Sequence, residues 1–474
     1  MTTNELPDSA DVGVVGAGIT GLALTRTLDG ASDDGDTGND TPEHTDEHTP
    51  EHTDDGDSSA PVVTLEASDE PGGIIRTRQV EGRVLDLGPQ RTRRSPPVRA
   101  LVEAMSLTEE VITASEDLPL YVFHDGALGR APLSPRAAIT TDLLSLRGKL
   151  RVLLEPLTGP PREGESVAGF LRRTLGPEAA ECVAAPLYAG LYGSDPDDMP
   201  VEHSLAHALE TAGIDRSILL DSLRTLLTMR LRGRERPPAV TFETGMAALP
   251  RALYRAHGDR IFLSTPVEGV GRTGERTEDS GGDRPGDRYR LDTPRGSVSV
   301  RDVVFTTPAP VTAGLLSEVA PRAADRLEGL SYNHLAVVHL DADFDRRGIG
   351  FLVAGEDTDL LGTTWNCSAF DREGVVTCYL GGAARPDLLA ESDDTLGALA
   401  ATEFESIVGG QARPLSVHRW TPGMPAYDGT WRALEGLDLP AGLHLCANFH
   451  ARAGIPGRIR AARATAERLR PATT

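Results

Sequence analysis

An α/β fold with two β-sheets, one of them assembled from distant parts of the chain, is what this sequence predicts. Near its start, an apolar strand over Val12–Val15 runs directly into a glycine-rich turn and a helix over Gly21–Leu28. A second apolar strand, Val62–Leu65, completes a strand–helix–strand unit. Far along the chain, short apolar strands such as Leu335–Leu340 and Val375–Gly381 indicate a separate, mixed sheet.

The turn after the first strand matches the pattern G-x-G-x-x-G, with Gly16, Gly18 and Gly21 at its fixed positions. The first glycine of this pattern allows a tight turn, the second lets backbone approach a pyrophosphate, and the third lets helix and strand pack closely. Phosphates then lie at the helix N-terminus, where unpaired N–H groups and the helix dipole attract anions. The turn therefore predicts a Rossmann-like dinucleotide-binding domain.

Glu66 follows the second strand, where a carboxylate can accept hydrogen bonds from ribose hydroxyls and disfavours the 2′-phosphate of NADP. It lies farther from the glycines than the usual ~20 residues because an acidic segment, 29–60, interrupts the unit. We expect this segment of Asp, Glu, Thr, Gly, Ser and His to be a disordered loop on the side away from the ligand. Its histidines recur every four residues, and a metal-binding tract is the alternative to a solvated linker: His44, His48 and His52.

Two glycine-containing blocks follow Glu66. In the first, Gly72 and Gly73 allow close backbone approach, and Arg76 can neutralise a pyrophosphate. The alternative is a plain turn beside a solvated arginine. In the second, Gly88 and Pro89 form a turn that could pass under a flat cofactor ring.

Seven blocks in order resemble the protoporphyrinogen/coproporphyrinogen III oxidase family, within the larger group of amine-oxidase-like flavoproteins. The resemblance extends over nearly the whole chain apart from the acidic segment, and several blocks in order are more specific than any one of them. The blocks are Val12–Leu22, Gly72–Thr77, Asp86–Pro89, Pro186–Asp195, Thr244–Leu249, Arg419–Tyr427 and Ala453–Pro456.

This resemblance implies an FAD-dependent oxidoreductase and carries a set of FAD contacts onto the matching positions. The helix after Pro456 would direct its N-terminus at the cofactor, where it can stabilise the anionic reduced flavin. The implied FAD-binding residues are Gly16, Gly18, Ile19, Thr20, Gly21, Glu66, Ala67, Gly72, Gly73, Ile74, Arg76, Gly88, Pro89, Gln90, Val267, Trp420, Ala453, Gly454 and Ile455.

The family reaction removes six electrons from a porphyrinogen in heme biosynthesis and passes them through FAD to dioxygen or another acceptor. Such a substrate is a large disc edged with carboxylates, so its site needs an apolar pocket with cations at the rim. Arg91, Arg93 and Arg94 are candidates for that rim, and a solvated cluster is the equal alternative. Asn448 is a further polar candidate near the flavin. The sequence suggests no catalytic acid, base or nucleophile, and no metal site outside the histidine tract.

Some positions depart from the family pattern. Gly457 and Arg458 replace an Asp-Cys pair, and Gln90 stands where many eukaryotic members carry an arginine. These changes concern substrate preference rather than flavin binding. Cys446 lies in an apolar strand, so we expect it to pack as a small hydrophobe rather than to attach flavin covalently.

The predicted organisation is a discontinuous Rossmann-like FAD-binding domain, a helical subdomain and a mixed-sheet substrate domain. The FAD-binding domain takes residues 10–92, 239–310 and 437–470. The helical subdomain takes 93–205. The substrate domain takes 206–238 and 311–436.

Composition limits the partners of the chain. Its 474 residues carry a net charge of −24 with a single lysine, Lys149, a balance that suggests a salt-adapted organism or GC-rich codon usage. General affinity for nucleic acid is therefore not expected. Four unpaired cysteines and a polar N-terminus predict a reduced, cytoplasmic setting, and the helical region leaves peripheral membrane contact open.

Other readings remain. An amine oxidase or a carotenoid desaturase would share the fold, and a flavin-binding scaffold would share the cofactor without the reaction. The Arg-Trp and Met-Pro-Ala-Tyr blocks favour the porphyrinogen branch. The sequence does not choose between copro- and protoporphyrinogen, and it does not give the oligomeric state.

Overall fold

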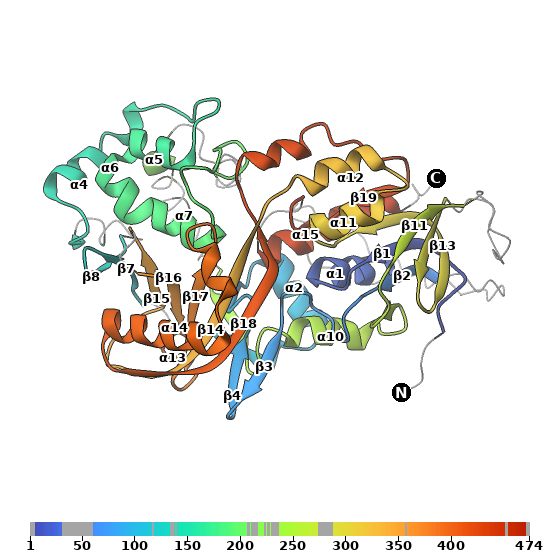
Figure 1. Cartoon of the computed structure of the whole chain (residues 1–474), viewed down its shortest axis with the longest axis horizontal. Helices are drawn as coiled ribbons and strands as arrows, with labels where there is room; N and C mark the ends of the chain where they lie inside the picture. Colours follow the sequence, from blue (N-terminus) through green and yellow to red (C-terminus); the bar gives the residue numbers. More distant parts are fainter. Residues whose placement is uncertain are drawn as a thin grey trace.

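The computed structural model describes most of the chain as two sheets that meet along one side (Figure 1). Most of the acidic segment 29–60, including its three histidines, lies outside the described residues, as do residues 274–287. The described residues are 5–30, 60–115, 118–132, 137, 140–205, 209, 217–221, 224, 228, 237–273, 288–355, 358–450 and 454–470.

The first sheet is built around β1 (Ser9–Val15), which pairs in parallel with two strands distant in sequence. These neighbours are β2 (Ala60–Leu65) and β13 (Gly296–Phe305). Beyond β13 lies β19 (Leu443–Leu445), also parallel. With β10, which pairs in parallel with β2, the carboxyl ends of five strands reach the same edge. The remaining strands are β10 (Ile261–Phe262) beside β2, and the antiparallel β12 (Tyr289–Thr293) and β11 (Gly269–Arg272).

Helices cover both faces of this sheet. One apolar cluster joins the sheet to four helices: α1 (Ile19–Leu28), α2 (Pro96–Ala104), α10 (Ala248–Ala256) and α15 (Ile455–Leu469). A second cluster on the other face includes α11 (Ala309–Leu316) and α12 (Pro321–Glu328). A sheet buried on both faces explains why its strands are almost continuously apolar.

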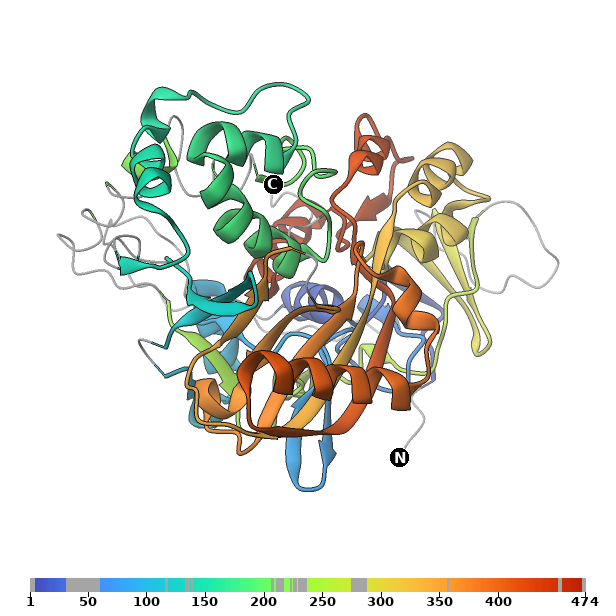
Figure 2. The same cartoon turned by 60° about the vertical axis from the view of Figure 1, so that its left-hand side comes forward.

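The second sheet is mostly antiparallel, and α14 (Asp393–Val408) lies across its outer face (Figure 2). Strand alternation turns Val338 and Cys378 toward α14, and turns His339, Thr377 and Tyr379 toward the first sheet's side. Its strands, in spatial order, are β18 (Gln411–Pro425), β14 (Tyr332–Asp343), β17 (Val375–Gly381), β16 (Leu360–Trp365), β15 (Gly350–Val353), β7 (Leu120–His124) and β8 (Ala127–Arg130).

Smaller elements complete the described chain. A hairpin and a three-stranded sheet lie between the two large sheets, and short helices lie at the far end of the second sheet, around β7 and β15 (Figure 1). The hairpin is β3 (Thr77–Val80) and β4 (Arg83–Asp86), and the small sheet is β5 (Thr92–Arg93), β6 (Val111–Thr113) and β9 (Ala239–Phe242). The helices around β7 and β15 are α4 (Leu146–Val152), η2 (Glu155–Leu157), α5 (Val167–Leu175), α6 (Pro177–Ala179), η3 (Ala180–Ala184) and α7 (Ala185–Tyr192). Elsewhere, α13 (Asn366–Phe370) connects β16 to β17, and η5 (Gly429–Leu434) packs near α12.

The α/β class and most of the predicted strands are confirmed. The sequence also predicts a strand over Leu263–Val270. This prediction is wrong for residues 263–268, because Ser264 adopts a positive φ and the N–H of Thr265 bonds to the Glu66 carbonyl, so that β11 begins only at Gly269. Asp142–Leu154 has a helical pattern in the sequence, but its helix begins only at Leu146, where the Ser145 side chain caps it. Three elements of the second sheet's layer were not predicted from the sequence: α14, β16 and β18.

The predicted domain ranges stay predictions. Within the range assigned to the helical subdomain, 93–205, β7 and β8 belong to the second sheet, because β7 pairs in parallel with β15. The helical pattern predicted for 203–231 lies mostly outside the described residues. No helix in the described part of the chain combines the length and the apolar character needed to cross a membrane.

His339, fully buried on β14, gives the fold a defined pH response. Burial lowers its pKa from 6.5 to about 4, so the ring is neutral and its Nε2–H donates to the Asp86 carbonyl at 3.0 Å. The unfolded chain takes up this proton near pH 6.5, so stability falls as the pH drops from there toward 4. We expect the wild type to lose roughly 1 kcal/mol more unfolding free energy than His339→Gln between about pH 7 and 5.5.

Urea unfolding at the two pH values measures this difference. Gln can keep the hydrogen bond to Asp86, so the comparison isolates the titrating ring. His124→Gln, which removes a partly exposed histidine of β7, is the matched control and should keep the wild-type response. Identical pH responses of wild type and His339→Gln would contradict the assignment.

Candidate cofactor site

The glycine turn after β1 is shaped by close backbone contacts. A Cβ at Gly21 would lie 2.0 Å from the Gly16 carbonyl oxygen, so only glycine lets α1 begin this close to β1. A Cβ at Gly18 would meet nothing within 4 Å, so the backbone there faces open space. The turn thus has both the tight closure and the open side that a bound pyrophosphate requires.

The second glycine block lies directly against the first. Gly72 forms an isolated parallel bridge with Gly18 and donates its N–H to the Ala17 carbonyl at 2.8 Å. Gly73 also lies against Gly18, and the next side chain, Ile74, is unusually exposed at 48% for a large apolar residue. Two blocks more than fifty residues apart in sequence therefore form one wall of the site.

Glu66 closes the end of β2. One carboxylate oxygen accepts the Ala17 N–H at 2.6 Å, and the other accepts the Ser68 N–H at 2.9 Å. Its backbone N–H and carbonyl bond to the strand and turn of β10, so the side chain is held at the edge where β1 and β2 both end. This is the position that the ribose-binding prediction requires; ribose binding by Glu66 itself remains a prediction.

Three helices direct their N-termini to this sheet edge. α1, α11 and α15 follow the adjacent parallel strands β1, β13 and β19. None has a side-chain cap or an acidic residue in its first turn. Free N–H groups and aligned dipoles make this edge attractive to an anion, so the residues present fit a dinucleotide pyrophosphate.

The turn from Asp86 to Gln90 connects this edge to the second sheet. Backbone carbonyls of the turn accept hydrogen bonds from two long strands: the Asp86 carbonyl from His339 of β14 at 3.0 Å, and the Leu87 carbonyl from Trp420 of β18 at 2.7 Å. The turn therefore cannot shift without moving the second sheet.

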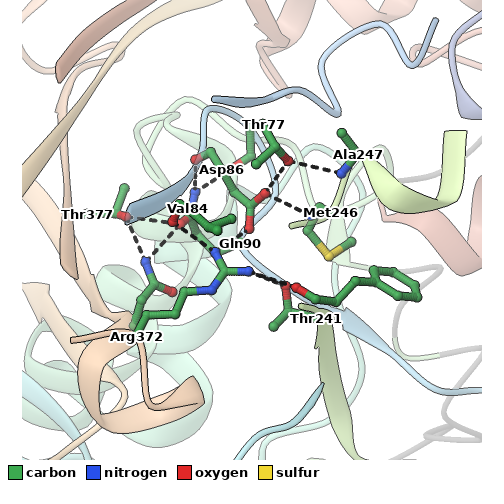
Figure 3. A network of polar contacts seen from close by, with 12 residues as sticks. Thr77, Val84, Asp86, Gln90, Thr241, Met246, Ala247, Arg372 and Thr377 are labelled. Atoms are coloured by element: carbon green, nitrogen blue, oxygen red, sulfur yellow. Dashed lines mark hydrogen bonds and ion pairs between the residues drawn. The ribbon is translucent and has the colours of Figure 1, made fainter. Parts of the chain in front are cut away.

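The Asp86 carboxylate is completely buried and fully paired (Figure 3). One oxygen accepts from the Thr77 hydroxyl at 2.6 Å and from the Met246 N–H at 2.8 Å. The other accepts from the buried guanidinium of Arg372 at 2.8 Å. Arg372 also donates to the Thr241 hydroxyl and to the Phe242 carbonyl, so both members of the pair have further hydrogen-bond partners.

Three of the sequence blocks, Gly72–Thr77, Asp86–Pro89 and Thr244–Leu249, therefore meet at the Asp86 carboxylate. Gly245 allows this convergence, because it has φ +92° and a Cβ there would lie 2.4 Å from Thr77 and 2.7 Å from Asp86. The Thr77 hydroxyl in turn accepts the Ala247 N–H at 3.1 Å. Blocks that appear separate in the sequence are parts of one junction.

Gln90 takes part in the same junction. Its amide nitrogen donates to the Asp86 and Gly88 carbonyls, and its Oε1 accepts from the side chains of Asn366 and Thr377, at 3.0 and 2.9 Å. The Gln90 side chain is thus committed to protein partners, which leaves its backbone for a cofactor contact.

The structure separates the three neighbouring arginines. Arg91 is largely buried, and burial lowers its pKa while the nearby Tyr379 opposes that shift. Arg93 is exposed and donates to the Pro237 carbonyl, and Arg94 bonds through its backbone N–H to the Pro238 carbonyl. Arg91 lies near Tyr379, whose side chain is on the inner surface of the second sheet.

Other predicted residues lie as follows. Arg76 donates to the Ser68 hydroxyl, pairs with Glu70 at 3.3 Å and lies 5.8 Å from the Trp420 ring centre. The Asn448 side chain accepts the Tyr332 hydroxyl at 2.9 Å. Four further candidates border the same edge: Ile19 and Thr20 are buried, Val267 is partly buried and Ala67 is exposed. Pro89 lies in the turn after Asp86, and Gly454 and Ile455 lie at the start of α15. Ala453 lies outside the described residues.

Four residues of the junction were not predicted from the sequence as site residues: Arg372, His339, Asn366 and Thr377. A buried arginine beside the Asp-x-Gly-Pro turn had no local signal, because its partner lies 286 residues away. A polar residue at every second position of an otherwise apolar strand, as at Thr377 and Tyr379, was an available hint. Among the described residues no cluster of His, Cys, Asp and Glu could hold a metal ion.

Removing one partner of the buried pair should be costly. We expect Arg372→Met to lower the free energy of unfolding by about 3–5 kcal/mol, because the Asp86 carboxylate stays buried without its cation. Denaturant unfolding of the holoprotein measures the change. Arg413→Met, which breaks an exposed pair with Glu81, is the matched control and should have little effect; equal effects of the two variants would refute the assignment.

Comparison with known proteins identifies the family of this fold and site. Residues 19–470 match the model of the flavin containing amine oxidoreductases. A chloroplastic protoporphyrinogen oxidase 1 of Spinacia oleracea is 26% identical over 409 residues, which cover 78% of this chain and 70% of that protein. A coproporphyrinogen III oxidase of Bacillus subtilis (strain 168) is 22% identical over 391 residues, covering 77% and 80%.

Solved structures agree on the fold. A crystal structure of a protein from Exiguobacterium sp. 255-15, provisionally named a protoporphyrinogen oxidase, has a TM-score of 0.73 and 22% identity over 97% of this chain and 98% of that one. Cyclohexylamine oxidase from Brevibacterium oxydans IH-35A has a TM-score of 0.66 and 16% identity over 98% and 99%. The glycine edge, the convergent helix N-termini and the family match together show that this chain belongs to the flavin-containing amine oxidoreductases and is an FAD-dependent oxidoreductase.

Proposed function

We propose that this chain oxidises a porphyrinogen, either protoporphyrinogen IX or coproporphyrinogen III, to the porphyrin of heme biosynthesis. The observation that carries the proposal is Arg91, a largely buried cation next to the cofactor turn that lies near Tyr379 on the inner surface of the second sheet. The names of the curated relatives support the same substrate class.

The inner surface of the second sheet suits a flat, mostly apolar substrate. Leu335 and Val337 of β14 lie in register with Trp420 and His418 of β18 on the same face. Tyr379 lies beside them on β17, and its hydroxyl contacts Thr364 of β16 at 3.3 Å. Apolar and aromatic side chains with few polar groups are typical of small-molecule sites.

Arg91 would hold one propionate of the substrate. Among the described residues it forms no ion pair with a carboxylate, and burial lowers its pKa from the ordinary value. A guanidinium can bind a carboxylate through two parallel hydrogen bonds. The exposed Arg93 would not take part, and Arg94 stays an alternative for a second carboxylate.

The chemistry divides between cofactor and chain. When bound, FAD supplies a two-electron acceptor, so six electrons and six protons leave the porphyrinogen in three steps, and dioxygen or another acceptor takes them up. The chain orients the disc between sheet and cofactor turn and excludes water from the reacting edge. His339 is neutral near pH 7 and is committed to the Asp86 carbonyl, so it positions the turn rather than moving protons.

Aerobic turnover of each porphyrinogen, followed by porphyrin fluorescence and oxygen uptake, tests the proposal. We expect porphyrin formation with at least one of the two, and an Arg91→Met variant with a KM about tenfold higher because one charge-assisted bond to carboxylate is lost. Arg93→Met is the matched control and should keep the wild-type KM.

The other outcomes separate the alternatives. Hydrogen peroxide release with primary amines but not with porphyrinogens would indicate an amine oxidase. A desaturated product from a carotenoid would indicate a desaturase, and flavin that no substrate bleaches would indicate a non-catalytic protein. Any of these results would overturn the porphyrinogen proposal.

We also propose a peripheral membrane contact through a leucine ridge on α4 and η2. The ridge consists of leucines at helical spacing with 52–83% of their surface exposed: Leu146, Leu150, Leu153, Leu154 and Leu157. Arg147, Lys149 and Arg151 lie on the same segment, whereas its one carboxylate, Glu155, is buried and accepts hydrogen bonds from Ser217 and the two residues that follow. An apolar ridge with adjacent cations suits an anionic lipid surface, even in a strongly acidic chain.

Flotation with vesicles tests the ridge. We expect the protein to float with vesicles that contain anionic lipid, and Leu150→Ser/Leu153→Ser to reduce the bound fraction several-fold. Leu389→Ser changes a partly buried leucine that packs against the core of the second sheet, and it controls for loss of membrane binding caused by destabilisation alone. No flotation, or a ridge-dependent dimer in gel filtration, would overturn the membrane proposal; the cytoplasmic location stays a prediction.

A further inference from the structure

Arg458 is a largely buried cation at the start of α15. It is the fourth residue of the helix, and its guanidinium points back to the sheet edge rather than out to solvent. There it donates to the carbonyls of Ala447 and Asn448, at 2.8 and 3.1 Å, just beyond the end of β19. The side chain thus lies at the edge where β1, β13 and β19 end.

In the part of the chain that the structure describes, no carboxylate compensates this charge. Among the described residues Arg458 has no ion pair, and the groups that influence its pKa are Tyr427, Cys446 and Tyr332. Burial is the main influence, and it lowers the pKa of the guanidinium from its ordinary value. Two backbone carbonyls satisfy its hydrogen bonds but leave its net charge in place.

The position is electrostatically unfavourable without an anion nearby. A cation in the first turn of a helix meets the positive end of the helix dipole, and the N-termini of α1 and α11 point to the same edge. The acidic chain, with its net charge of −24, places no acid in the first turns of these helices. A concentrated positive potential at this edge would favour a cofactor that becomes negative.

We propose that Arg458 stabilises negative charge on the FAD held at the N-terminus of α15, and so sets the reduction potential of this protein. The proposal rests on the FAD cofactor of the family and not on the proposed substrate. Here the chain departs from the Asp-Cys pair that the resemblance predicts. Gly457 stands in place of the acid and has no charged side chain, and Arg458 stands in place of the cysteine and adds a cation.

The alternative is a purely structural role, in which Arg458 only holds the Ala447–Asn448 backbone. A structural role would change thermal stability and FAD retention. It would not change the affinity of retained FAD for sulfite, which adds to the oxidised ring through a new S–N bond and leaves the negative charge on that ring. Sulfite affinity therefore measures the positive charge at the cofactor, and no porphyrinogen is needed.

The experiment compares Arg458→Gln, Arg458→Lys and Arg460→Gln as FAD-loaded proteins. Arg460 is exposed on the same helix, so Arg460→Gln removes an equal charge at a position away from the edge. We expect Arg458→Gln to bind sulfite at least about tenfold more weakly and to have a potential about 30 mV lower, the equivalent for a two-electron couple. Arg458→Lys should recover most of both properties, and Arg460→Gln should match the wild type.

Unchanged sulfite affinity and potential in Arg458→Gln would overturn the inference. If that variant does not retain FAD, Arg458→Lys decides, because it keeps the charge and loses the paired hydrogen bonds. Wild-type sulfite affinity in Arg458→Lys is what the charge effect requires, and a tenfold loss despite the retained charge would overturn the inference. Loss of porphyrinogen turnover with normal sulfite binding would count against the proposed substrate and not against this inference.

Discussion

The buried carboxylate of Asp86 is the interaction on which the arrangement of this protein depends. It gathers Thr77, the Met246 N–H and Arg372 at one point, and those partners come from β3, from the turn before α10 and from the loop that leads into β17 (Figure 3). A buried charge is tolerated only when it is fully paired, so this point fixes the relative positions of all three segments. The position of the turn that follows Asp86 is therefore fixed by that junction.

The same principle explains how an acidic chain keeps an anion-binding edge. Acids are absent from the first turns of α1, α11 and α15, and the acids near the edge, Glu66 and Asp86, have their oxygens occupied by hydrogen bonds. Helix dipoles and buried arginines can therefore act at short range, where solvent and salt screen them little. Electrostatic character at the site is set locally and not by the net charge.

The sequence predicted the cofactor half well because its signals are local. The glycine turn, Glu66 and the second glycine block each follow from backbone geometry within a few residues, and the structure places them side by side. The second sheet was predicted only in part, since β18 contains three prolines and Arg and His side chains that hide its alternation. Arg372 and His339 could not be found from sequence, because their roles arise from pairing across more than 250 residues.

A double-mutant cycle on Asp86 and Arg372, read as the dissociation constant of FAD, tests this account most directly. Asp86→Asn, Arg372→Met and the double variant would be titrated with FAD under the same conditions. If the pair positions the cofactor turn, each single change weakens FAD binding and the double change costs less than the sum, with a coupling of about 0.5–3 kcal/mol. Strictly additive effects, or unchanged FAD affinity in both single variants, would contradict the central role of this junction.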